Sequence, residues 1–243
     1  MFDPFGDYAT AGYLRNVAAE KDLQLVKIAE HQLFRAQLAE AFAYLQKRKP
    51  ISYRDFLKVH EILFGGLYPW AGKDRAQLLP DRAVAKGEVF LAHPQDCKRA
   101  VDEALSQVQG KGQIANRPGF VMGLFAYGHP CLDGNGRTML VVHAELCFRA
   151  GISIDWTQTS KDSYLQALTR EIESPNDGHL DVYLKPFIRD KVPRDAWIAT
   201  IGDLSGLDGS NAGEEVAVSY ADPAVAQHYR EFERRRNYKL SDT

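Results

Sequence analysis

Residues 129–137 bring together side chains that can handle a phosphate group. The run reads His-Pro-Cys-Leu-Asp-Gly-Asn-Gly-Arg, so it combines a titratable base, a carboxylate, two glycines, an amide and a guanidinium. An imidazole titrates near neutral pH, so His129 can take a proton from an attacking hydroxyl. Asp133 can hold Mg²⁺ against phosphate oxygens, because this ion takes few protein carboxylates and keeps several waters. The run therefore predicts a site for phosphate chemistry.

The two glycines of the run fall where a loop enters a helix that the apolar pattern predicts over residues 135–150. Gly134 and Gly136 have no Cβ, so their backbone N–H groups can approach phosphate oxygens closely. Asn135 lies between them, and Arg137 adds a fork of donors. The N–H groups and the dipole of a helix N-terminus favour negative charge. We interpret this loop as the anion-binding part of the site.

A plain turn is the alternative interpretation of the same loop. Asp, Asn and Gly are the residues that turns prefer, so the Asp-Gly-Asn-Gly segment at 133–136 would by itself indicate a turn. His129 precedes this segment and Arg137 follows it, and a turn requires neither a base nor a guanidinium. The complete run therefore favours a site.

The elements that must position this run are predicted to be helices with short breaks between them. Apolar side chains recur at helical spacing in residues 18–47, 52–64, 95–109, 118–127 and 161–173. In the first of these segments the predicted apolar stripe includes Leu25, Ile28 and Phe34, and Ser52 is placed to cap the second. Helix after helix predicts an all-α fold.

Two further segments depart from this helical pattern. Between residues 76 and 94, two short extended runs flank a polar connection, which indicates a hairpin; an ordinary surface hairpin is the simplest interpretation. Residues 202–213 are rich in Gly, Ser and Asp and are typical of a linker. Residues 223–240 are predicted to form a terminal helix whose basic run at 234–236 is most simply a solvated face.

Composition limits the class of protein. The chain has 243 residues, of which 45% are hydrophobic, so it can bury a sizeable core. A net charge of −2 argues against a nucleic-acid partner, and no apolar run approaches the ~20 residues of a membrane span. Three cysteines without metal-ligand spacing indicate reduced thiols. We expect a cytoplasmic protein with no nucleic acid and no membrane as partner; export as an effector is the second location that the sequence allows.

The run at 129–137 resembles the signature of the Fic (filamentation induced by cAMP) family, His-Pro-Phe-x-Asp-Gly-Asn-Gly-Arg-x-x-Arg. Cys131 stands where the family has Phe, and Leu140 stands where it has a second Arg; the other defined positions agree. Segments that resemble the Fic core also lie at residues 3–6, 12–16, 68–73 and 151–156, and the resemblance covers about residues 1–190.

The resemblance implies a protein adenylyltransferase (AMPylator). Such a nucleotidyltransferase moves AMP from its co-substrate ATP to a Ser, Thr or Tyr hydroxyl of a target protein. By similarity, His129 is the catalytic base and Asp133 is the ligand of Mg²⁺. The nucleotide-binding residues implied by the resemblance are Gly134, Asn135, Gly136 and Arg137.

The resemblance also implies an architecture. The Fic fold is an all-α helical bundle with a β-hairpin flap over the active site, and the flap would lie at about residues 76–94. The Fic domain would span residues 1–192 with its core motif at 129–140, followed by a linker and C-terminal helical extension over 193–243. In this family the flap docks the target chain as an added strand. Homo-oligomers are common in the family, so a homo-oligomer is compatible with the resemblance.

The departures from the signature leave other functions open. In the family the second Arg engages the outer phosphate of ATP and pairs with an inhibitory Glu from a Ser/Thr-x-x-x-Glu-Gly/Asn helix. Leu140 can do neither, and the sequence contains no match to the inhibitory pattern. A separate inhibitory antitoxin, as in a toxin–antitoxin pair, is therefore expected. The alternatives are a Fic-fold transferase that uses another nucleotide or phosphate donor and a catalytically silent interaction module; retention of His129 and Asp133 favours an enzyme.

Two basic residues outside the motif are further candidates for phosphate contacts. Lys73 is the last residue of the segment at 68–73 that resembles the Fic core, and Arg75 lies two residues further on, so both side chains could reach a phosphate.

Overall fold

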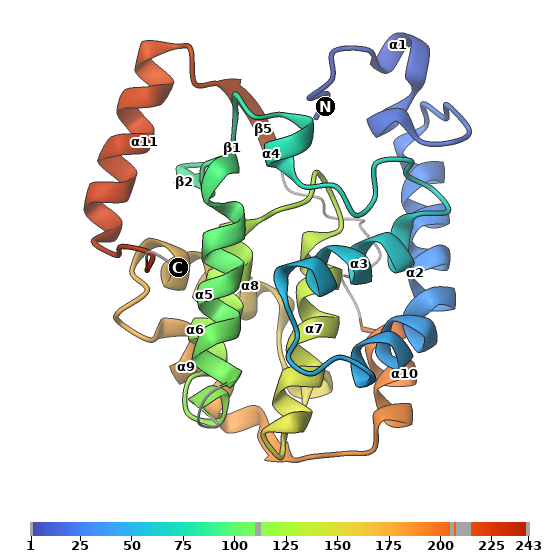
Figure 1. Cartoon of the computed structure of the whole chain (residues 1–243), viewed down its shortest axis with the longest axis vertical. Coiled ribbons are helices and arrows are strands. Elements are labelled where there is room, and N and C mark those ends of the chain that lie inside the picture. The colour runs from blue at the N-terminus through green and yellow to red at the C-terminus, as the bar shows by residue number, and fades with distance from the viewer. Residues whose placement is uncertain (1, 110–112, 205–206, 208–214, 242–243) are drawn as a thin grey trace.

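The computed structural model describes residues 2–109, 113–204, 207 and 215–241 (Figure 1). Helices dominate this part of the chain and the strands are short, which confirms the predicted helical bundle with a hairpin. The helices are α1 (Tyr8–Ala11), α2 (Leu23–Gln46), α3 (Tyr53–Phe64), α4 (Arg75–Leu78), α5 (Cys97–Gln109), α6 (Pro118–Gly128), α7 (Asn135–Arg149), α8 (Lys161–Glu173), α9 (His179–Leu184), α10 (Arg194–Gly202) and α11 (Pro223–Arg236). The strands are β1 (Arg82–Lys86), β2 (Val89–Phe90), β3 (Ile152–Ile154), β4 (Ile188–Asp190) and β5 (Glu215–Ser219).

The tail of the chain lies against the helical core. In α11 the Phe232 side chain is buried, and Glu233 accepts a hydrogen bond from the Tyr127 hydroxyl at 2.8 Å. Arg236 Nε donates to the backbone carbonyl of Ile172 at 3.0 Å. α11 lies within the predicted terminal helix, whereas most of the predicted linker at 202–213 lies outside the described residues. None of the helices in the described ranges combines the length and apolarity that a membrane crossing requires.

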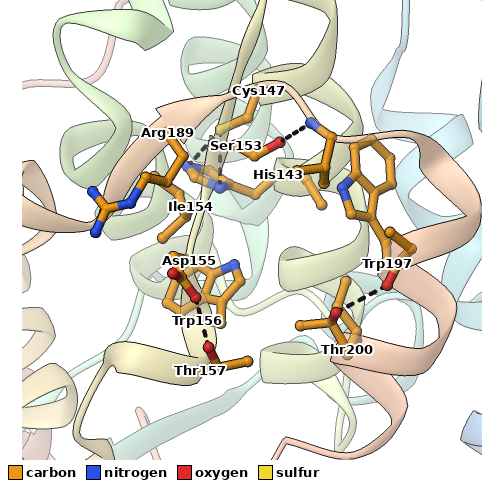
Figure 2. A pocket seen from close by; sticks show the side chains of 14 residues that line it. His143, Cys147, Ser153, Ile154, Asp155, Trp156, Thr157, Arg189, Trp197 and Thr200 are labelled. Carbon is orange, nitrogen blue, oxygen red and sulfur yellow. Dashed lines mark hydrogen bonds between the residues drawn. The ribbon is translucent and has the colours of Figure 1, made fainter.

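The far end of α7 meets a second small sheet. β3 and β4 pair antiparallel, with Ser153 opposite Arg189, and Val192 N donates to the Ser153 hydroxyl at 3.1 Å. The side chains of Trp156 and Trp197 stand around a cavity of about 290 Å³ between this sheet, α7 and α10 (Figure 2).

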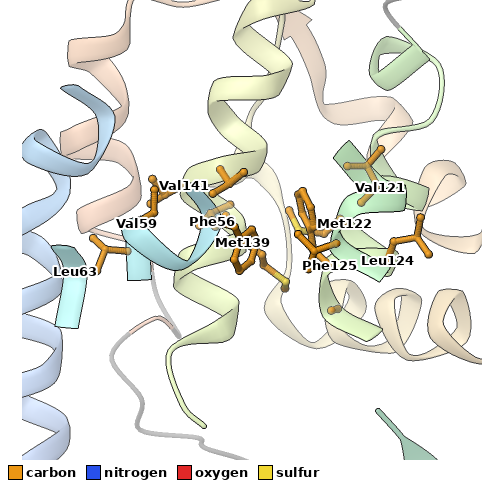
Figure 3. Close-up of a cluster of buried hydrophobic side chains, with 14 of the residues drawn as sticks. Phe56, Val59, Leu63, Val121, Met122, Leu124, Phe125, Met139 and Val141 are labelled. Atoms are coloured by element: carbon orange, nitrogen blue, oxygen red, sulfur yellow. The ribbon is translucent and has the colours of Figure 1, made fainter. Parts of the chain in front are cut away.

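The core is centred on α6. Every residue of this helix is buried, and it packs against α5, α7, α8 and α9. Figure 3 shows the layer in which α3, α6 and α7 meet, with side chains such as Phe56, Phe125 and Met139 in one cluster. An apolar sequence on all faces of a helix is typical of such a central position. The two ends of the candidate motif are therefore attached to the most buried helices of the described chain.

Local sequence signals set the helix starts. Ser52 and Asp55 form a capping box at the start of α3, which confirms the predicted Ser cap. At the start of α2 the Asp22 carboxylate accepts a hydrogen bond from Gln24 N at 2.8 Å. A cap of this kind is typically worth about 1 kcal/mol.

The predicted apolar stripe is wrong over the first turns of α2. Leu25 and Ile28 are more than half exposed, whereas Lys27 and Glu30 are buried. The charged face turns inward because its partners are charged groups of the 129–137 run, far away in sequence.

The predicted hairpin forms within residues 76–94. β1 and β2 pair antiparallel across a two-residue turn, with Lys86 opposite Val89, and Gly87 takes a left-handed φ of 58° in that turn. A third strand was not expected: β5 pairs antiparallel with the other edge of β1, from Arg82 opposite Ser219 to Lys86 opposite Glu215. The sheet order is therefore β2-β1-β5.

Candidate active site

His129 lies at the point where α6 ends. Its backbone takes the left-handed conformation (φ 41°, ψ 56°), and its N–H donates to Phe125 O at 3.1 Å. This conformation is uncommon for a residue with a Cβ, although His adopts it more readily than most. The turn stops α6 and sends the chain toward α7, so the imidazole lies at the wall of a cavity between the motif, the flap and α8.

The loop after His129 is held by the side chain of Asn135. Its carbonyl oxygen accepts from Cys131 N and its amide donates to Cys131 O, both at 2.8 Å. Cys131 itself is fully buried, and burial raises the pKa of its thiol. The Asn135 side chain thus fixes the loop, which leaves the backbone of the first turn of α7 to face the cavity.

Glycine occurs at the two motif positions for different structural reasons. Gly134 has a left-handed φ of 75°, and a Cβ added to it would lie 2.6 Å from Cε2 of Phe64. A Cβ added at Gly136 meets no atom within 4 Å, and Gly136 lines the cavity. Gly134 is therefore required by the turn itself, whereas Gly136 keeps open space beside the N-terminus of α7.

Asp133 lies at the loop end in contact with a cation. Its Oδ2 is 2.5 Å from Lys27 Nζ, and its Oδ1 accepts from Gly134 N at 2.6 Å. His60 Nε2 lies 3.0 Å from the backbone carbonyl of Asp133, while His60 Nδ1 accepts from Gly72 N. The ring therefore carries its proton on Nε2, and burial lowers the pKa of His60 to about 4. His60 is a structural support for the loop, in line with its position on the apolar side of α3.

Arg137 forms a buried ion pair with Glu30 of α2. Glu30 has no exposed surface, and its Oε2 also contacts Lys27 Nζ at 3.1 Å and accepts from the Tyr68 hydroxyl at 2.7 Å. The guanidinium carbon of Arg137 lies 4.8 Å from the centre of the Phe64 ring. We call Lys27, Glu30, Asp133 and Arg137 the charge cluster; it places two cations and two carboxylates directly behind the loop.

Arg75 does not extend toward a phosphate, in contrast to the expectation. It is fully buried, and its Nε donates to the backbone carbonyl of His129 at 2.7 Å. One Nη donates to Ala92 O at 2.7 Å, just after the flap. The backbone N–H of Arg75 donates to Pro130 O at 2.7 Å. Arg75 therefore joins the motif loop to the end of the flap, because backbone carbonyls take up its donors.

The cavity beside His129 has a volume of about 300 Å³. Gly136 and Leu140 line it from α7, Lys86 from the flap and Lys161 from the start of α8. The tail contributes Leu204 and Leu207 among the other lining residues. Leu140 stands in the wall with little exposed surface, so this position supplies an apolar contact rather than a charge. The arrangement suits a ligand with an apolar, planar part and an anionic part near the first turn of α7.

The family model for the Fic/DOC family matches residues 50–147, which include α3, the flap, α6 and the motif. The chain contains a Fic domain. This assignment explains why the loop, the flap and α7 meet at one cavity.

Two curated relatives are similar to this chain. Protein adenylyltransferase VbhT of Bartonella schoenbuchensis is 30% identical over an alignment of 181 residues that covers 68% of this chain and 35% of that protein. Probable protein adenylyltransferase y4lH of Sinorhizobium fredii is 24% identical over an alignment of 172 residues that covers 67% of this chain and 85% of that protein. The chain thus spans about a third of the length of VbhT and most of the length of y4lH.

Solved structures share the fold. The BepC protein of Bartonella tribocorum, crystallised with bound AMPPNP, superposes with a TM-score of 0.60 at 18% identity, over 76% of this chain and 96% of that one. The N-terminal Fic domain of a Bep effector from Bartonella quintana, with bound ADP, gives a TM-score of 0.59 at 19% identity, over 78% of this chain and 96% of that one.

The structure brings together all six residues predicted for the site of this Fic domain. His129 and Gly136 line the cavity with Asn135, while Asp133 and Arg137 lie behind the loop in the charge cluster. Sequence reasoning missed Lys27 and Glu30. Their spacing of three residues indicates a local ion pair on the helix, but it does not mark the pair as buried, because other charged and polar residues occur throughout α2.

Proposed function

We propose that the protein is a protein adenylyltransferase that transfers AMP from ATP to a hydroxyl side chain of a target protein. The observation that carries this proposal is that His129 and the glycine-opened first turn of α7 line one cavity. The similarity to VbhT, a protein adenylyltransferase, and to y4lH, a probable one, supports the reaction type. The BepC structure with bound AMPPNP and the Bartonella quintana domain with bound ADP support an adenine nucleotide as the ligand of this fold.

In this reaction His129 takes the proton from the target hydroxyl. The hydroxyl oxygen then forms a bond to the α-phosphorus of ATP, the bond from that phosphorus to the β-bridging oxygen breaks, and pyrophosphate leaves. Backbone N–H groups at Asn135 and Gly136, in the cavity wall, stabilise the charge that develops on the phosphate oxygens. Arg137 would add its guanidinium only by leaving its ion pair with Glu30. One donor aimed at such charge is worth about 3–4 kcal/mol.

Asp133 fits a role as a ligand of Mg²⁺. Its Oδ2 already contacts a cation, Lys27 Nζ, and a single protein carboxylate suffices when phosphates and waters complete the shell. We infer that Asp133 holds Mg²⁺ against the phosphates of ATP, which would neutralise the charge of the leaving pyrophosphate. Lys27 would then lie between Asp133 and Glu30 and keep Asp133 in position.

The extension completes the site in this proposal. Residues 1–192 form the transferase domain, and residues 193–243 add Leu204 and Leu207 to the cavity wall and β5 to the flap. The target protein docks at the flap. We propose action in the cytoplasm under a separate inhibitory antitoxin, supported by three buried free cysteines and the absence of the inhibitory sequence pattern. Delivery as an effector is the alternative, and the VirB-translocated Bartonella effectors that share the fold support it.

Intact-mass analysis tests the reaction. The purified protein is incubated with Mg²⁺ and each nucleoside triphosphate in turn, with and without a cell lysate. We expect a protein to gain one nucleoside monophosphate with ATP, and His129→Asn to abolish the gain. Asn suits the left-handed backbone at this position better than Ala does. His228→Ala, on the exposed face of α11, is the matched control that should retain the gain.

A Fic transferase with another donor is the second candidate, and Leu140 favours it. The apolar side chain offers no charge to an outer phosphate. If ATP is the donor and its outer phosphate reaches this wall, Leu140→Arg should lower the dissociation constant of ATP by about tenfold, as a charge-assisted hydrogen bond would. If Leu140→Arg leaves the dissociation constant of ATP unchanged and the mass experiment detects transfer from a different nucleotide, that nucleotide is the donor.

A further inference from the structure

Both edges of the first flap strand are occupied by this chain itself. β2 covers one edge over two residues, and β5 covers the other over five, with each Ala of one strand opposite a Val of the other from Ala83–Val218 to Ala85–Val216. Leu91 N donates to Val84 O on the β2 side, and Tyr220 N donates to Asp81 O on the β5 side. A strand edge of this kind is the element that an incoming peptide uses for strand addition.

The edge of β1 that pairs with β5 ends at the cavity that contains His129, the candidate base. Lys86, the last residue of β1, lines the same cavity as His129. A target segment paired with β1 would therefore bring its residue opposite Lys86 to the cavity mouth. A segment added outside β5 would lie one strand spacing, about 4.8 Å, further away. The residue that β5 places opposite Lys86 is Glu215, which has no hydroxyl to modify.

β5 is held less firmly than the helix that follows it. It is an edge strand, and Val216 is 51% exposed. The chain is anchored directly after β5. There the centre of the Tyr220 ring lies 4.5 Å from the centre of the His93 ring and 5.4 Å from that of the Tyr229 ring. β5 can thus leave β1 while α11 stays on the core through Phe232 and Glu233.

Given target docking at the flap, we propose that β5 is a resident strand that occupies the docking edge of β1 and that the target must displace it. The partner is an extended segment with small or β-branched apolar side chains, because the alternating Ala and Val residues of β1 and β5 show what this edge accommodates. The acceptor hydroxyl is carried by the residue that takes the place of Glu215. This inference rests on the proposed function, because it assigns the route by which the target reaches His129.

Two proline variants test the exchange without any catalytic readout. N–H groups alternate along a strand, so Val218, like Tyr220, directs its N–H to β1, whereas Ala217 directs it away. Val218→Pro should therefore release β5, and Ala217→Pro is the matched control. The probe is a fluorescent synthetic peptide of residues 215–222, titrated with the full-length variants.

We expect the peptide to bind Val218→Pro at least about tenfold more tightly than Ala217→Pro. In Ala217→Pro the resident β5 stays paired with β1 and, as a tethered strand, competes with the peptide at a high effective concentration. Equal affinity for the two variants, or no binding to Val218→Pro, would overturn the exchange. This result is independent of nucleotide transfer, so it separates the docking inference from the proposed function.

A reversible lock tests whether targets use the same edge. Arg82 and Ser219 are opposite each other at a non-hydrogen-bonded position, where Cα atoms lie close enough for a disulfide. In the Arg82→Cys/Ser219→Cys protein, oxidation should abolish labelling of lysate proteins by ATP, reduction should restore it, and ATP binding should be equal in both states. Equal labelling in both states would show that targets do not displace β5. Absence of labelling even by the wild type would instead count against the proposed function, and the peptide titration would still decide the exchange.

Discussion

Two cavities of similar volume border α7, and each has a histidine in its wall. The cavity at the N-terminal half of the helix is about 300 Å³ and contains His129, and the one at the C-terminal half is about 290 Å³ and contains His143 (Figure 2). His143 is fully buried, with Nε2 2.9 Å from Pro118 O and Nδ1 3.5 Å from Cys147 Sγ. Burial lowers the pKa of His143 to about 4, so its ring is neutral.

The difference between the cavities lies in what surrounds the histidine. Beside His129 the first turn of α7 faces open space at Gly136, and the charge cluster lies behind the loop. Beside His143 both ring nitrogens contact the protein, and no helix N-terminus enters the cavity wall from α7. A histidine in a cavity therefore becomes a candidate base only together with an anion-binding backbone and charges of both signs.

The largest expected effect separates the two histidines. His129→Asn should lower the rate of nucleotide transfer by about 10²–10⁴-fold, the usual contribution of a positioned base. His143→Gln should leave the rate of the folded protein close to wild type. Transfer is followed by mass spectrometry, and circular dichroism confirms that both variants fold. A loss of transfer in folded His143→Gln would break the comparison.

The charge cluster should matter for stability as much as for chemistry. Glu30→Gln leaves Arg137 and Lys27 buried without their shared carboxylate, and removal of one partner of a buried ion pair costs about 3–5 kcal/mol. Urea denaturation measures this loss. Arg35→Gln removes an exposed ion pair with Asp203 and is the control, with an expected change below about 1 kcal/mol. Equal effects of the two changes would mean that the cluster does not act as a buried unit.

The neutral state of His143 predicts a dependence of stability on pH. Its folded pKa of about 4 lies below the ordinary value of 6.5, so the unfolded chain binds more protons between these values. The stability that His143 contributes is present above pH 6.5 and is lost as pH falls toward 4, by about 3 kcal/mol. The free energies of unfolding of wild type and His143→Gln are compared across this range. Parallel curves would contradict the assignment of a neutral, buried ring.

The smallest expected effect concerns the open space at Gly136. Gly136→Ala adds a methyl group where the protein has no atom within 4 Å, so the melting temperature should not fall. The methyl group would crowd a bound phosphate and weaken nucleotide binding by about 1–2 kcal/mol. Isothermal titration measures the affinity. Gly134→Ala should instead lower the melting temperature, because its Cβ would lie 2.6 Å from the Phe64 ring. An unchanged melting temperature of Gly134→Ala would contradict this explanation of the glycine.

Local patterns were sufficient for the parts of the site that are local. The loop between two helices, the glycines at a helix N-terminus and the hairpin all follow from residues a few positions apart, and the structure contains each of them. His60 is buried in the core, because its position repeats with apolar neighbours on α3.

Long-range partners account for what the sequence could not predict. Lys27 faces inward because Asp133 supplies the opposite charge, and no periodicity of α2 alone contains that information. Arg75 is buried because the carbonyls of His129 and Ala92 accept its donors. β5 has an ordinary strand sequence, but its pairing with β1 depends on where the following helix, α11, anchors the tail on the core.

The place of β5 in the chain has a consequence for synthesis. A ribosome releases β1 and β2 long before it releases β5, so the motif loop and α7 are complete while the edge of β1 is still uncovered. During that interval the nascent chain exposes an unpaired strand edge, a known template for aggregation. Translation that stalls between α10 and β5 would leave that edge open, and such chains should depend on chaperones more than finished ones.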